Sequence, residues 1–143
     1  MQSTTEQNKK AVQRFNKEFI EQGKLEAFEE LIADGVVNHS APPGSSTGAD
    51  GMLYFLQSIL RAGFPDLKVE ILDQLAEADK VTTRKIIHAT HTGAFMGIPA
   101  SGKKVGIQVI DIIRLRDGKY VEHWAVSNLA EVMATLSTSN HVA

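Results

Sequence analysis

The chain contains no cysteine. This absence excludes a disulfide framework, a thiolate metal site and a cysteine nucleophile. The formal net charge is −2, and no run of basic residues is longer than two, so we expect no nucleic-acid partner. No apolar run approaches the roughly 20 residues that a membrane helix needs. The polar segment Met1–Lys10 also lacks the apolar core of a signal peptide. We therefore expect a cytoplasmic protein with no membrane partner.

Several signatures of cofactor and metal sites are also missing from the sequence. Neither glycine-rich phosphate-binding pattern occurs after a predicted strand. No two histidines have the helical spacing of a metal site with a carboxylate beside them. Ser45-Ser46 lack the strand-to-helix context of a serine nucleophile. These absences predict a protein that uses no metal and no cofactor.

The first half of the chain has helical periodicity. Ser3 and Glu6 have the spacing of a capping box ahead of a helix predicted over 5–22. Further helices are predicted over 25–32 and 52–60, with a short extended piece at 36–39. The segment between this piece and the third helix is rich in proline, glycine and serine, which predicts a loop.

The second half has the alternation and the β-branched residues of strands. Strands are predicted over 68–77, 81–92, 104–116 and 120–126. One last helix is predicted over 128–136. Helices followed by an antiparallel meander indicate an α+β fold. No linker or repeat divides the sequence, so residues 1–143 are predicted to form a single domain.

The last two predicted strands are apolar on both faces. Isoleucine and valine occupy both parities over 107–113, whereas a sheet with one solvated face shows polar residues at alternate positions. The helices can cover only one of these faces. We therefore expect a homodimer through the outer face of the sheet, with Trp124, the only tryptophan, at or near the contact.

Two strand motifs carry a resemblance to a known family. They are His-Thr-Gly-Ala-Phe-Met-Gly-Ile-Pro at 91–99 and Asp-Ile-Ile-Arg-Leu-Arg-Asp-Gly-Lys at 111–119, with Glu-His-Trp at 122–124 and Asn38-His39 in support. Together they resemble the SnoaL-like polyketide cyclases and their ester cyclase relatives, from about Asn8 to Leu136. The resemblance implies a cone-shaped fold, in which a curved, mixed or antiparallel sheet packs on three N-terminal helices and encloses an apolar pocket. Nuclear transport factor 2, ketosteroid isomerases and limonene epoxide hydrolases share this fold.

The resemblance also bears on chemistry. The characterised cyclases close a ring by an intramolecular aldol condensation, using an aspartate that a histidine assists. In our alignment Ala125 stands at the position of that aspartate, and Asp111 stands at the position of the histidine. Asp111 also falls where ketosteroid isomerases carry the neutral carboxylic acid of their oxyanion hole.

Asp111 is itself an unusual residue, because it lies in the middle of a strand between isoleucines. An unpaired carboxylate buried there costs several kcal/mol or takes up a proton. We therefore predict that Asp111 is a catalytic acid or oxyanion donor. The alternatives are a hydrogen-bonded carboxyl in the core and a residue at the dimer interface.

His123 is the candidate acid–base partner of Asp111, and the register of the last hairpin decides whether the two meet. A two-residue turn at Asp117-Gly118 would place Asp111 opposite Trp124, and His123 on the other face. A three-residue loop at 116–118, with Gly118 in a bulge, would place Asp111 opposite His123, and this is the register that we favour. The alternative for His123 is a surface histidine.

The remaining candidates are predicted to bind substrate. Asn38 and His39 lie at the base of the cone, where they could orient a carbonyl or move a proton, although an ordinary turn is an equal alternative. His91 ends a strand, where it could contact substrate or anchor a loop. The apolar wall is assigned to Phe15, Phe19, Phe55 and Phe95, each of which could equally belong to the core.

These observations predict a cofactor-free enzyme that acts on a small apolar carbonyl compound. Asp111 and His123 would perform acid–base chemistry next to the carbonyl, leading to an aldol-type cyclisation or an isomerisation. Epoxide or ester hydrolysis on the same fold is one alternative. A non-catalytic binder of an apolar ligand is another, because Ala125 replaces the family's acid/base residue.

Overall fold

A computed structural model describes residues 3–138, and the N-terminal half forms the predicted helices. Helix α1 (Thr4–Arg14) begins at Ser3, whose hydroxyl accepts a hydrogen bond from the Glu6 N–H, as the capping box predicts. The helix continues as a wider π-helical segment, η1 (Phe15–Glu21), and ends before Gly23, whose φ is +74°. Helix α2 (Leu25–Leu31) follows.

The third predicted helix is also continuous, and the last helix is present. Helix α3 (Ala49–Leu53) runs into a second π-helical segment, η2 (Tyr54–Leu60), and then into α4 (Arg61–Gly63). Helix α5 (Leu129–Ser137) ends the described part of the chain. Within residues 3–138, no helix is long and apolar enough to cross a membrane.

The five strands form one open, mixed sheet. They are β1 (Ile32–Asn38), β2 (Lys68–Glu77), β3 (Lys80–Thr90), β4 (Lys104–Arg116) and β5 (Lys119–Ser127). Their order is β1-β5-β4-β3-β2, with β1 parallel to β5 and the other pairs antiparallel. Strand β1 starts at Ile32, a residue that the apolar periodicity had placed in the preceding helix.

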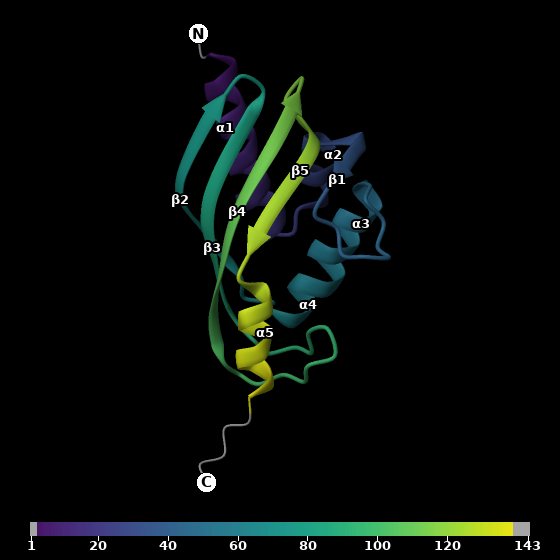
Figure 1. Ribbon diagram of the computed structural model, residues 1–143, viewed down its shortest axis with the longest axis vertical. Coiled ribbons are helices and arrows are strands. Elements are labelled where there is room, and N and C mark those ends of the chain that lie inside the picture. Colours follow the sequence, from purple (N-terminus) through teal and green to yellow (C-terminus); the bar gives the residue numbers. More distant parts are fainter. Residues whose placement is uncertain (1–2, 139–143) are drawn as a thin grey trace.

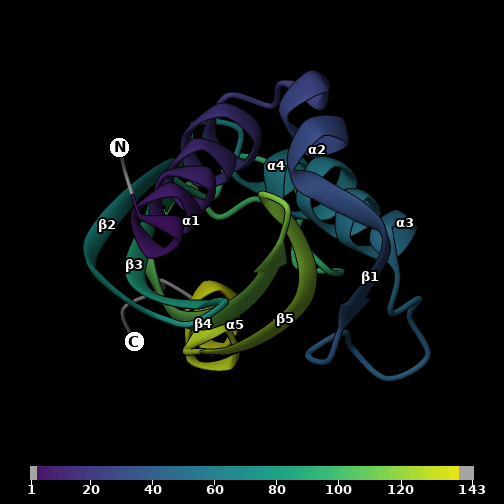
Figure 2. The same cartoon turned by 90° about the horizontal axis from the view of Figure 1, so that it is seen from above.

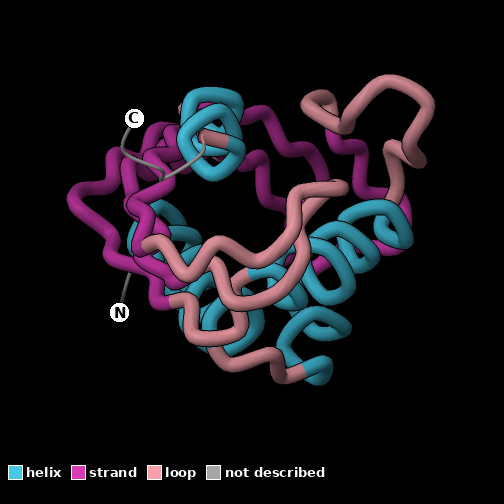
Figure 3. Tube along the Cα trace, turned by 90° about the horizontal axis from the view of Figure 1, so that it is seen from below, coloured by secondary structure: helices cyan, strands magenta, loops and turns pink. Residues whose placement is uncertain are grey.

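The sheet curls around the helices to form a cone, which confirms the predicted fold class (Figures 1 and 2). Helix α5 and the loop between β3 and β4 lie together at the lower end of the molecule (Figure 3). That loop approaches α4 so closely that a Cβ at Gly93 would lie 2.0 Å from the carbonyl oxygen of Ala62. Only glycine fits this contact.

The inner face of the sheet combines apolar residues with a few charged and polar ones. In β3, burial alternates strictly, with Val81, Thr83, Lys85, Ile87 and Ala89 buried. The neighbouring strand β4 buries Ile107, Asp111, Ile113 and Leu115 on the same face. Charged groups therefore lie inside a largely apolar cone.

The hairpin between β4 and β5 differs from both registers considered from the sequence. Asp117 and Gly118 form a two-residue turn with φ values of 53° and 76°, so the favoured three-residue loop is wrong. A bulge at Val121 then shifts the register, because Leu115 pairs with Tyr120 but Arg114 pairs with Glu122.

Asp111 consequently pairs with Ala125, neither with Trp124 nor with His123. His123 lies two residues before Ala125 in β5, and side chains two residues apart in a strand share a face. Asp111 and His123 therefore face the same side of the sheet, as diagonal neighbours. The bulge restores the shared face that the simple two-residue turn would have removed.

Candidate active site

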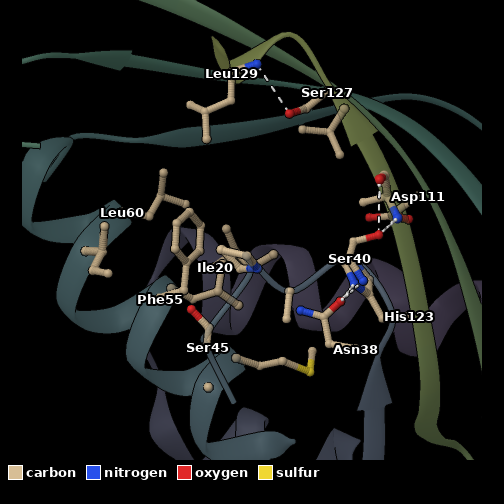
Figure 4. A pocket seen from close by; sticks show the side chains of 18 of the residues that line it. Ile20, Asn38, Ser40, Ser45, Phe55, Leu60, Asp111, His123, Ser127 and Leu129 are labelled. Atoms are coloured by element: carbon tan, nitrogen blue, oxygen red, sulfur yellow. Dashed lines mark hydrogen bonds between the residues drawn. The ribbon is translucent and has the colours of Figure 1, made fainter. Parts of the chain in front are cut away.

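A cavity of about 770 Å³ opens between the helices and the inner face of the sheet. Its wall is mainly apolar, and Phe55 and Leu60 on one side oppose the sheet on the other (Figure 4). The polar side chains that the sheet contributes to its lining are Asn38, Lys85, Asp111, Tyr120, His123 and Ser127. A cavity of this size and character suits a small, mostly apolar molecule.

Lys85 and Asp111 form a buried ion pair in this wall. Lys85 Nζ lies 3.1 Å from Asp111 Oδ2, and each side chain is only 5% exposed. The ammonium group supplies the counter-charge that a buried carboxylate requires. Lys85 is therefore a charged partner of Asp111 that the sequence analysis did not consider.

The ion pair is held in place from the helical side. Lys85 Nζ donates to Asn16 Oδ1 over 2.6 Å, and Asn16 Nδ2 donates to the Val12 carbonyl over 2.9 Å. The other carboxylate oxygen, Asp111 Oδ1, is buried and has no hydrogen-bond partner among the described residues. An unpaired buried acceptor is costly in a folded protein, and this one belongs to a residue in the cavity wall.

His123 is oriented by Asn38, its register partner on the parallel strand β1. His123 Nδ1 lies 2.7 Å from Asn38 Oδ1 (Figure 4). The same Oδ1 accepts the Ser40 backbone N–H over 3.0 Å, so this atom must be the amide oxygen. His123 Nδ1 must then carry the proton, which leaves Nε2 with a free lone pair. The amide nitrogen of Asn38 lies on the side away from His123 (Figure 4).

The surroundings keep His123 and Tyr120 uncharged. Burial lowers the pKa of His123, an effect that the negative charge of Asp111 partly opposes. Complete burial, together with the charge of Asp111, raises the pKa of the Tyr120 phenol well above its usual value. His123 can therefore act as a neutral base, whereas Tyr120 remains a neutral phenol that can donate or accept a hydrogen bond.

The structure brings five of the nine sequence-predicted site residues to the cavity. These are Asp111, His123, Asn38, Phe15 and Phe55. Phe15 also packs on Tyr120, with ring centroids 4.8 Å apart, so it belongs to both the wall and the core.

The other four predicted site residues lie elsewhere. His39 Nε2 bonds Glu122 Oε2 over 2.8 Å, and its ring stacks on Trp124, which places it on the outer side of the sheet. Strand alternation causes this, because His39 follows inward-facing Asn38 directly. His39 is therefore not placed to bind a ligand in the cavity.

His91 anchors a loop and does not line the cavity. Its Nδ1 accepts the Ser101 backbone N–H over 3.1 Å and bonds the Ser101 hydroxyl over 2.9 Å. Phe19 and Phe95 are core residues, packed against Phe28 and Phe64 respectively. The structure therefore agrees with the alternatives considered from the sequence, which were a loop anchor for His91 and a core position for Phe19 and Phe95.

The sequence reasoning missed Lys85, Asn16 and Tyr120. A signal for Lys85 was present, because it shares the parity of Val81 and Ile87 within a strand that was itself predicted. A lysine on an apolar face needs an anionic partner or a function. Asn16 is reached only through tertiary contact across 69 residues of sequence, and no local pattern indicates it.

Among residues 3–138, no three histidine, aspartate or glutamate side chains gather as metal ligands. The fold and the cavity define a cone-shaped α+β protein with a largely apolar cavity inside the cone. The family model of the SnoaL-like polyketide cyclases matches residues 10–136. The chain belongs to this family.

Solved structures extend the comparison. IdmH from Streptomyces antibioticus, a candidate polyketide cyclase, is 31% identical, with a TM-score of 0.80, over 92% of this chain and 99% of that one. A SnoaL-like protein from Jannaschia sp. CCS1 is 26% identical, with a TM-score of 0.84, over 97% and 98% of the two chains. AclR from Streptomyces galilaeus, a candidate hydroxylase, is 26% identical, with a TM-score of 0.81, over 93% and 97%. No curated protein matches the chain.

Proposed function

We propose that this protein performs cofactor-free acid–base chemistry on an apolar carbonyl compound, leading to an aldol-type cyclisation or an isomerisation. The observation that carries the proposal is the fixed tautomer of His123, which presents a free Nε2 from the wall of an apolar cavity. The family membership and the candidate cyclase IdmH favour cyclisation.

His123 is the general base in this proposal. Its Nε2 takes a proton from the carbon next to the carbonyl, and the electron pair of the broken C–H bond forms an enolate. Asn38 Oδ1 holds the Nδ1–H, so the ring keeps its orientation as it becomes an imidazolium. The negative charge of Asp111 stabilises that imidazolium.

The same proton completes either reaction. In a cyclisation, the enolate carbon attacks a second carbonyl of the same molecule, and the imidazolium protonates the new alkoxide. In an isomerisation, the imidazolium returns the proton to a different carbon. Both routes leave His123 neutral again and consume no co-reactant.

Proton abstraction can be tested before the natural substrate is identified. We expect the protein to catalyse hydrogen–deuterium exchange next to the carbonyl of apolar ketones and esters in D₂O, followed by NMR. The control is each compound in the same buffer without protein. Binding without faster exchange would overturn the acid–base proposal in favour of a non-catalytic binder, and cleavage of the ester would indicate a hydrolase.

We propose that the outer face of the sheet binds a second copy of the chain. Ile110, Ile112 and Val126 are 44%, 37% and 69% exposed there, on neighbouring strands, and contiguous exposed apolar surface of this kind indicates an interface.

Sedimentation should yield twice the 15.6 kDa chain mass. Val126→Lys should shift the protein to monomer, whereas Leu25→Lys, on exposed apolar surface of α2, should not. A wild-type monomer at high micromolar concentration would contradict the proposal.

A further inference from the structure

The ammonium group of Lys85 has one N–H donor that no described residue engages. A lysine ammonium carries three N–H donors. One donates to Asn16 Oδ1, and Nζ also forms an ion pair with Asp111 Oδ2 over 3.1 Å. Among residues 3–138, no further acceptor is hydrogen-bonded to or paired with Nζ. The third N–H is therefore available to a bound molecule.

The position of Lys85 makes that donor effective. Lys85 lies in the cavity wall, with Ile87 next to it on the same face and Val109 opposite it on β4. A charge-assisted hydrogen bond is stronger in such apolar surroundings than in water. An apolar pair would fill the same core positions at no desolvation cost, so stability alone does not account for this ion pair.

We propose that Lys85 binds the carbonyl oxygen of the substrate and stabilises the negative charge that develops on it when His123 removes the proton. Lys85 is then a catalytic residue, and Asp111 is its counter-ion. This inference rests on the proposed function, because it assigns the electrophilic group for the same reaction. The arrangement is an oxyanion site with a fixed ammonium, whose geometry Asn16 and Asp111 set before the ligand arrives.

This assignment competes with the sequence-based prediction that Asp111 itself donates a proton to the oxyanion. The two assignments predict opposite changes in the affinity for an oxyanion when the carboxyl group of Asp111 is removed. If Lys85 binds the oxyanion, the negative charge of Asp111 repels that oxyanion, and removing the charge strengthens binding. If Asp111 is the donor, or accepts a ligand hydroxyl at its unpaired Oδ1, removing the carboxyl group weakens binding.

Naphthalene and its hydroxylated analogue, naphthol, make a matched pair of probes. Both have the same apolar rings, and ionised naphthol carries a conjugated oxyanion like that of an enolate. The fluorescence of the ring system reports binding, and the absorption spectrum of naphthol distinguishes the neutral from the ionised form. A titration of each probe therefore separates occupancy of the cavity from stabilisation of the oxyanion.

Lys85→Met removes the ammonium group, and Lys85→Met/Asp111→Asn removes it without leaving a buried carboxylate alone. We expect both variants to bind ionised naphthol about tenfold to a hundredfold more weakly than wild type, the usual worth of a hydrogen bond to a charged group. Naphthalene should bind equally to wild type and to the double variant. Asp111→Asn alone should bind ionised naphthol more tightly than wild type.

Three results would overturn the inference. The first is an unchanged preference for ionised naphthol in the double variant, and the second is weaker binding of ionised naphthol by Asp111→Asn. The third is wild-type binding of naphthalene with naphthol bound only in its neutral form, which would remove the role of Lys85 and leave the apolar-ligand site intact. If naphthalene itself fails to bind, the proposed function is wrong and the role of Lys85 falls with it.

Discussion

Replacing Lys85 with methionine is expected to lower the free energy of unfolding by about 3–5 kcal/mol. Asp111 is 4% exposed, and its Oδ1 has no hydrogen-bond partner within residues 3–138. Without the ammonium group, the carboxylate would lie uncompensated in an apolar wall, and it could only take up a proton or open the structure to water. Denaturation by urea at neutral pH, monitored by circular dichroism, measures the loss.

Two controls separate the buried charge from the loss of a lysine in general. Lys85→Met/Asp111→Leu removes both charges, so we expect it to recover most of the stability lost in the single variant, or to exceed wild type. Arg84→Met breaks the ion pair with Asp73, in which the side chains are 52% and 60% exposed, and should barely move the denaturation midpoint. A Lys85→Met protein as stable as Arg84→Met would show that the buried pair contributes little.

Replacing His123 with glutamine is expected to slow the exchange of protons next to a substrate carbonyl by about 10²–10⁴-fold, the usual effect of losing a general base. Glutamine retains a polar side chain of similar length, which can still bond Asn38, but it has no basic nitrogen. The NMR exchange assay described above measures the rate. The matched control is His88→Gln, because His88 is an exposed histidine that bonds Glu70 on the outer side of β3.

The pH dependence of the same assay tests the state of His123. Because burial lowers the pKa of His123 below the usual histidine value of 6.5, the neutral base should persist to a lower pH than in an ordinary histidine. The exchange rate should therefore fall only below pH 6.5. The pH–rate profile of His123→Gln should lack this acidic limb. Full activity of His123→Gln, with the limb retained, would remove His123 from the mechanism.

The lowered pKa also has a consequence for stability. Below pH 6.5 the unfolded chain binds a proton at His123 that the folded protein resists. The free energy of unfolding should therefore decrease as the pH falls from 6.5 towards the lower pKa of His123 in the folded state. Above pH 6.5, the titration of His123 should not change the stability. The His123→Gln variant should lose less stability than wild type over this window.

The arrangement of helices and strands could be predicted because it depends on local periodicity. The Ser3–Glu6 capping box, the apolar stripe through Phe15 and Phe19, and the alternation in β3 each involve residues close in sequence. The motifs at 91–99 and 111–119 carried the family resemblance, which the match over residues 10–136 confirms.

The sequence was less informative about the cavity because strand parity is sensitive to single residues. His39 and His123 were both plausible site histidines, yet one faces out and the other faces in. The bulge at Val121 decides the face of His123, and neither turn type considered from the sequence includes it. One extra residue in a strand reverses the face of every residue beyond it.

By itself, the sequence determined the fold class, the family and the presence of a carboxylate in the middle of an apolar strand. Only the tertiary structure decided what surrounds that carboxylate. Asn38 and His123 are 85 residues apart, and Lys85 and Asn16 are 69 apart, so each contact depends on how whole strands and helices pack. Local patterns specify helices and strands through backbone geometry and burial, whereas the charge state and orientation of a buried side chain depend on partners that packing brings together.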